Sequence, residues 1–130
     1  MNRTRRRFLA TFLAVASLAF ASTAAIAAPS ATVRTPAQEI DALIQRVSAA
    51  RGVAFIRNGT EYTAQDAATH LRRKLNAAKG KITTPEQFIA KLGTQSSMSG
   101  KPYRVRLANG REMDSAAWLN GLLREVRAGR

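Results

Sequence analysis

Four segments of the chain place apolar residues three and four positions apart, which is the spacing of one face of an α-helix. They lie within residues 36–52, 64–80, 85–93 and 115–130. A threonine or an aspartate stands just before each segment, where a side chain can accept a hydrogen bond from the first turn of a helix. The pattern therefore predicts four amphipathic helices with these N-cap residues: Thr35, Thr63, Thr84 and Asp114.

Two short segments show strand character instead. The apolar run that contains Phe55 stops at Asn58-Gly59, and residues 103–107 alternate apolar and basic side chains before a second Asn-Gly pair at Asn109. Asn-Gly suits the positive φ angles of a tight hairpin turn. We therefore expect an α+β fold, with about four helices packed on a small antiparallel sheet built from two Asn-Gly hairpins.

The two basic strand positions and two acidic residues near the turns have open roles. Arg104 and Arg106 are expected on the solvent face of their strand, where they could bind anions or keep an edge strand from aggregating. Glu61 and Glu112 occupy equivalent positions beside the two turns, close to several cations. For these two carboxylates the sequence favours surface ion pairs.

The first 27 residues have the order of a secretory signal peptide: a basic start, an apolar run from Phe8 to Ile26, and small residues up to Ala27. We expect cleavage after Ala27, a disordered leader over residues 28–34 and a single α+β domain over residues 35–130. The run is diluted by serine, threonine and alanine, so no stable membrane anchor is expected after cleavage. The protein would be periplasmic or secreted. Residues 4–9 also resemble a twin-arginine signal, so the Sec and twin-arginine routes both remain open.

Composition limits the chemistry of the expected domain. The chain has no cysteine and one histidine, which excludes disulfides and sites built from several Cys and His ligands, and no metal or cofactor is expected. Without the arginines of the expected signal, 17 Lys and Arg face 8 Asp and Glu. That excess favours an anionic ligand or cell-envelope component as a partner, although a solvated basic surface is the alternative. Nucleic acid is not expected for an exported chain, and the oligomeric state is open.

Most of the unusual side chains fall in residues 55–75 and 96–103. His70 borders the apolar stripe of its helix, and Lys74 lies one turn later on the same side. With Arg57 they could form a cationic rim; alternatively, His70 makes a polar contact at the core edge and Lys74 lays its stem along apolar surface. The candidate ligand-binding residues are Arg57, Asn58, Tyr62, His70, Lys74, Ser97, Ser99 and Tyr103.

Three classes of function fit these residues. The leading interpretation is a non-enzymatic binding module for an anionic ligand. A small hydrolase is the alternative, with Ser97 or Ser99 of the 96–99 loop as nucleophile and His70 as base, but no G-x-S-x-G motif is present and no catalytic residue is assigned. A structural partner subunit would expose an apolar patch around Trp118 or Met98.

Several runs also resemble a known family. They are FIRNG at residues 55–59, then Tyr62, Ala67, His70-Leu71, Lys74 and Phe88-Ile89, then SSMSGKPY at residues 96–103 and Trp118-Leu119. In these runs the chain resembles the YfeK-like family of small exported bacterial proteins, over essentially the whole expected mature chain. The resemblance implies export and a shared fold. It implies no activity, because that family is a domain of unknown function.

Overall fold

The computed structural model describes residues 33–130; the expected signal peptide and most of the expected leader lie outside the described residues. The elements follow in this order: α1 (Pro36–Ala49), β1 (Ala54–Arg57), β2 (Thr60–Tyr62), α2 (Ala64–Ala77), α3 (Pro85–Leu92), β3 (Arg104–Arg106), β4 (Glu112–Asp114) and α4 (Ser115–Arg127). Four helices and a four-stranded antiparallel sheet confirm the α+β class. None of the helices within residues 33–130 is long and apolar enough to cross a membrane.

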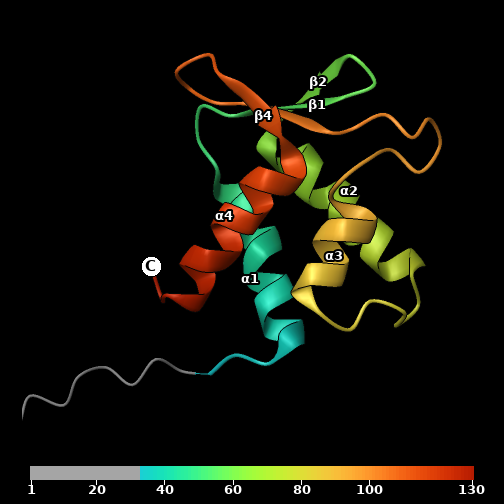
Figure 1. Cartoon of the computed structure of the whole chain (residues 1–130), viewed down its shortest axis with the longest axis vertical. Coiled ribbons are helices and arrows are strands. Elements are labelled where there is room, and N and C mark those ends of the chain that lie inside the picture. The colour runs from blue at the N-terminus through green and yellow to red at the C-terminus, as the bar shows by residue number, and fades with distance from the viewer. Residues whose placement is uncertain (1–32) are drawn as a thin grey trace, which may run out of the picture. The chain divides into compact units, whose positions relative to one another are not determined.

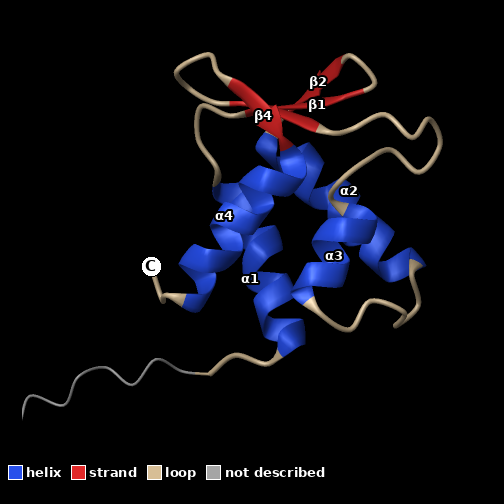
Figure 2. Ribbon diagram, viewed as in Figure 1, coloured by secondary structure: helices blue, strands red, loops and turns tan. Residues whose placement is uncertain are grey.

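The four strands form one sheet in the order β2-β1-β3-β4. The sheet lies at one end of the group of helices (Figures 1 and 2). β1 and β3 pair in the middle with Phe55 opposite Val105, so the two hairpins meet through their first strands. β3 is therefore an interior strand, and an edge-protecting role for Arg104 and Arg106 is wrong, because β2 and β4 form the edges.

The two connections that contain Asn-Gly differ in length. Arg57 pairs with Thr60, which leaves a two-residue turn in which Asn58 and Gly59 both have positive φ, 52° and 78°. In the other hairpin five residues separate the last strand pair, and Gly110 alone takes positive φ there. The Asn109 side chain instead accepts a hydrogen bond from the Arg111 backbone N–H at 3.0 Å. The same dipeptide thus serves two loop geometries.

The core lies between the helices and one face of the sheet. Phe55 and Val105 contribute from the strands, and the predicted apolar stripe of α1 is buried in full. The largest fully buried side chains are Phe88, Leu43, Leu119, Val47, Val105 and Val126. Every helix and the first strand of each hairpin therefore contribute to one core.

The predicted caps are correct at three helices. Thr35 forms a reciprocal capping box with Gln38, and Thr63 and Thr84 each accept a hydrogen bond from the first turn of their helix. Asp114 is at the N-cap position of α4, but the capping role is wrong: its carboxylate makes no cap hydrogen bond and accepts one from Arg104 instead.

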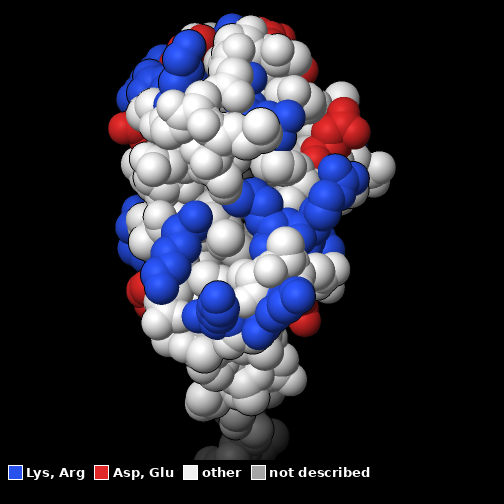
Figure 3. All heavy atoms as spheres, turned by 90° about the vertical axis from the view of Figure 1, so that its right-hand side faces the viewer, with Lys and Arg blue, Asp and Glu red and all other residues white. Residues whose placement is uncertain are grey.

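Basic side chains are spread over the face of the domain on the right of Figure 1, which is turned toward the viewer in Figure 3. The α2–α3 connection and the α3–β3 loop lie on this side. Acidic side chains stand mainly toward its margins.

Candidate functional site

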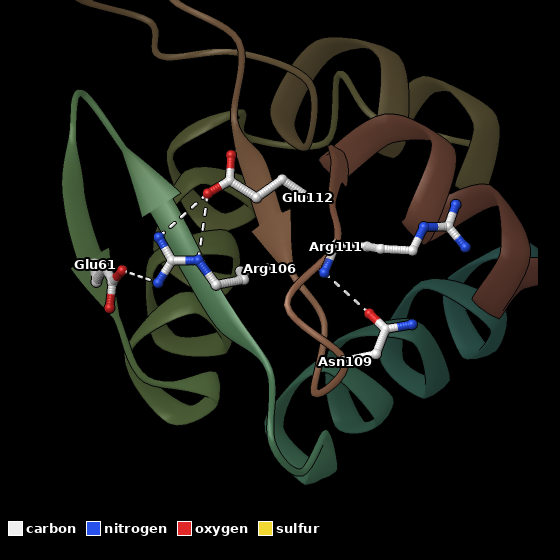
Figure 4. A network of polar contacts seen from close by, with 5 residues as sticks. All are labelled: Glu61, Arg106, Asn109, Arg111 and Glu112. Atoms are coloured by element: carbon white, nitrogen blue, oxygen red, sulfur yellow. Dashed lines mark hydrogen bonds and ion pairs between the residues drawn. The ribbon is translucent and has the colours of Figure 1, made fainter.

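The solvent face of the sheet is occupied by ion pairs. Figure 4 shows the Arg106 guanidinium between the carboxylates of Glu61 and Glu112. Arg104 pairs in the same way with Asp114. The predicted surface ion pairing of the two glutamates is confirmed, and these arginines already have anionic partners within the chain.

A cavity of about 400 Å³ lies where β1 and β2 meet α2, with Tyr103 and the first half of α4 completing its wall. Cavities that hold small molecules start at roughly 300 Å³. Its apolar wall consists of Phe55, Ile56, Ala67, Leu71 and Leu119. Four of the eight predicted ligand-binding residues also line it: Arg57, Tyr62, His70 and Tyr103.

These four polar residues form a connected chain along the cavity wall. Arg57 Nη2 donates to the Tyr62 hydroxyl at 3.2 Å, and the guanidinium lies over the Tyr62 ring, 5.0 Å from its centroid. Arg57 Nη1 is 3.2 Å from the ring nitrogens of His70. His70 Nε2 is in turn 3.2 Å from the Tyr103 hydroxyl. The geometry joins β1, β2, α2 and the segment before β3 at one place.

Arg57 has no carboxylate partner within residues 33–130, although it is partly buried. Among residues 33–130, the hydrogen bonds of its guanidinium go to Tyr62 and His70. Asp66 also lines the cavity, but its carboxylate accepts a hydrogen bond from the Thr63 hydroxyl at the start of α2. The positive charge of Arg57 is therefore not neutralised by a direct contact.

Burial lowers the pKa of His70 below its ordinary value of 6.5, and the positive charges of Arg57, Lys74 and Arg73 lower it further. Burial also raises the pKa of the Tyr103 phenol, an effect that Arg57 partly opposes. At neutral pH the imidazole is thus uncharged and the phenol protonated. The cations that line the cavity are Arg57, Arg73 and Arg104, and of these Arg104 is paired with Asp114.

Lys74 does not line the cavity. Its Nζ donates to the backbone carbonyls of Leu92 at 2.9 Å and Gln95 at 3.3 Å, and to the Tyr103 hydroxyl at 3.2 Å. Burial and then the charge of Arg57 lower its pKa. Leu92 is the last residue of α3, so Lys74 binds carbonyls at the end of that helix. The same amine also donates to the Tyr103 hydroxyl.

Asn58, Ser97 and Ser99 also lie away from the cavity lining. The Ser99 hydroxyl donates to the Asn58 side-chain oxygen, which fastens the α3–β3 loop to the β1–β2 turn. Ser97 is exposed. No hydrogen bond among the described residues joins a serine hydroxyl to His70.

Trp118 and Met98, the two residues around which a partner subunit would expose an apolar patch, differ in their surroundings. Trp118 packs edge-on against Phe55, with ring centroids 5.2 Å apart and an angle of 73° between the planes. Met98 is 98% exposed on the α3–β3 loop. Of the two residues, Met98 is therefore the exposed one, and Trp118 is partly buried.

Sequence reasoning missed Asp66 and Arg73, which line the cavity beside His70. Their spacing of four and three residues from His70 places all three on one side of α2. Extending the helical period from the histidine in both directions would have found them. Within residues 33–130 no three Asp, Glu or His side chains cluster in a way that could hold a metal ion.

The second hairpin and α4 repeat the strand-strand-helix order of the first hairpin and α2, but α4 lacks the polar residues that α2 contributes to the cluster. Counted from the first residue of each helix, Gly121 and Glu125 in α4 stand where α2 has His70 and Lys74. The second unit therefore has no counterpart of His70 and Lys74 at these helix positions.

Comparisons with known proteins agree with the sequence resemblance. A model of a family of unknown function (DUF5329) matches residues 34–127. The chain is similar to the uncharacterized protein YfeK of Salmonella typhimurium, with 39% identity over 64 residues, which is 49% of this chain and 53% of the relative. The alignment thus spans about half the length of that curated relative. No solved structure matches.

Proposed function

Because the chain belongs to the DUF5329 family, whose function is unknown, we propose a function from its own geometry: an exported, non-enzymatic module that binds a small organic anion in the cavity beside Arg57. The observation that carries this proposal is the guanidinium of Arg57, which is partly buried, lines the cavity and has no carboxylate partner in the described part of the chain. A charged donor in such a position gains more from an anion than one in open solvent does.

The neighbouring hydroxyl adds a second donor. An arginine has only donors, so the Tyr62 oxygen accepts from Arg57 and keeps its own O–H for another acceptor. The contacts of Tyr62 within residues 33–130 give that O–H no acceptor. A carboxylate, sulfonate or phosphate oxygen in the cavity would accept from both groups.

The apolar wall narrows the ligand further. Phe55, Leu71 and Leu119 lie on the same cavity as Arg57. Apolar surface favours an apolar body, and the few polar groups fix the orientation of the ligand. The ligand class is therefore a small organic anion that joins an apolar part to one acidic group.

Titration calorimetry with anilinonaphthalenesulfonate, an aromatic sulfonate, tests this function. We expect Arg57→Gln to weaken binding about tenfold or more, since a hydrogen bond to a charged group is worth about 1.5–3 kcal/mol. Arg111→Gln is the matched control, because Arg111 is exposed on the β3–β4 loop and does not line the cavity. Equal affinity of the Arg57 variant and the control would disprove the assignment of the site.

We also propose that the protein is exported from the cytoplasm. The basic, apolar and small-residue regions of the first 27 residues support it. Intact mass spectrometry of the protein recovered from the periplasm of an expressing bacterium should give a chain that begins at Ala28. A full-length product confined to the cytoplasm would contradict export.

A further inference from the structure

The lysines of this chain have a one-sided distribution. All five lie within residues 74–101, a stretch that runs from the second half of α2 to the loop before β3. Lys74 contacts carbonyls and Tyr103, as described above. The other four are exposed and define what we call the lysine face: Lys79, Lys81, Lys91 and Lys101. Their segments lie on the side of the domain that Figure 3 presents.

The acidic side chains of the described residues leave this face unneutralised. Seven of the eight Asp and Glu residues form ion pairs, and every partner is an arginine. No lysine within residues 33–130 takes part in an ion pair. The single carboxylate between Lys74 and Lys101 is Glu86, and it pairs with Arg127 of α4.

An apolar side chain is presented on the same side. Met98 is 98% exposed on the α3–β3 loop, three residues before Lys101. The loop that carries it is closed by backbone hydrogen bonds, from Ser96 N–H to the Lys101 carbonyl at 3.0 Å and from Gly100 N–H to the Ser96 carbonyl at 2.9 Å. The methionine is therefore displayed to solvent from a loop closed by hydrogen bonds, and almost none of its surface is buried.

We propose that the lysine face docks the protein reversibly on an anionic lipid bilayer, with Met98 inserted at the interface. Lysines are hydrated point charges on long stems, which suits a diffuse layer of phosphate headgroups better than a shaped protein partner. An exposed apolar side chain among cations adds the hydrophobic contact that interfacial proteins use. This surface does not include the cavity residues around Arg57, so docking and ligand binding are separable.

Vesicle sedimentation with phosphatidylcholine, with and without phosphatidylglycerol, tests the docking. One variant replaces Lys79, Lys81, Lys91 and Lys101 with glutamine. Its matched control replaces Arg51, Arg111, Arg124 and Arg130 with glutamine. These arginines are exposed and without ion pairs in the described structure, on segments that lie to the left in Figure 1. Both variants lose the same charge and begin at the same residue as the wild type, so differences between them report on the lysine face.

The wild type should bind the phosphatidylglycerol vesicles, and salt should weaken the binding. Each surface lysine contributes about fivefold to partitioning, so the lysine variant should lose about a hundredfold or more while the arginine variant stays within about tenfold of the wild type. Equal losses in the two variants would show that only net charge matters. That result, or equal binding to both vesicle types, would overturn the proposal.

A fluorescent label tests the insertion of Met98. The chain has no cysteine, so Met98→Cys provides a unique attachment point for an environment-sensitive dye. Its emission should shift to the blue with phosphatidylglycerol vesicles. A label at Ala117→Cys, exposed on α4, should not shift. A shift at both positions or at neither would contradict docking through this loop.

Discussion

Arg57 stands two residues after Phe55 on β1, so both side chains leave the sheet on the same face. The phenylalanine reaches the core, and the arginine reaches the edge of the core, where the cavity opens. That position explains why the guanidinium contacts Tyr62 and His70, while Arg106, on the other face, reaches Glu61 and Glu112. Arg57 and Arg106 thus project from opposite faces of the sheet, and, within residues 33–130, carboxylates are within reach of Arg106 alone of the two.

The charge state of His70 follows from its neighbours. Burial and three nearby cations lower its pKa, so the imidazole is neutral at pH 7. A bound anion would favour the imidazolium and raise that pKa. By linkage, the anion would then bind more tightly as the pH falls through the pKa values of the free and bound states. In the proposed site, the affinity for the anion would therefore depend on pH.

At the scale of the elements, the contact between the end of α3 and α4 limits what residue can follow α3. A Cβ atom added at Gly93 would lie 2.5 Å from Cδ1 of Leu119, a core side chain that is 1% exposed, so that side chain would have to shift. Gly121, inside α4, is the contrast: an added Cβ there meets only the Arg124 guanidinium at 3.7 Å.

These two glycines give opposite predictions for stability. Gly93→Ala should lower the free energy of unfolding by about 1–3 kcal/mol through overpacking. Gly121→Ala should raise it by about 0.5–1 kcal/mol, because alanine is the better helix former. Urea unfolding of the two variants beside the wild type measures both. A neutral Gly93 variant would mean that α3 and α4 are less tightly packed than described.

The sequence was sufficient for the helices and for most of their caps, because both depend on residues three or four positions apart. It failed at Asp114, where a competing contact with Arg104 ten residues away removed the cap. It also could not place β3 inside the sheet, since strand order is set by pairing between distant segments. Contacts between residues close in the sequence were predicted correctly, and contacts between distant residues were not.

At the scale of the whole molecule, the candidate site also depends on contacts between distant segments, and the sequence predicted these only in part. The sequence predicted that Arg57 and His70 lie close together, because one hairpin and the helix after it contain both. It did not predict the acceptors of Lys74, because these include backbone carbonyls near the end of α3, which no side-chain pattern reveals. Ser97 was chosen for its hydroxyl, and it is exposed and lines no part of the cavity. The result is a cavity with one charged wall, and a separate lysine face.

The single histidine of the chain lies in the cavity, so it reports directly on the proposed anion site. Its imidazole gives one set of NMR signals, which can be titrated with and without anilinonaphthalenesulfonate. We expect a pKa below 6.5 for His70 in the free protein and a higher pKa in the presence of the sulfonate. A pKa at or above 6.5 in the free protein that saturating sulfonate leaves unchanged would contradict an anion site beside Arg57.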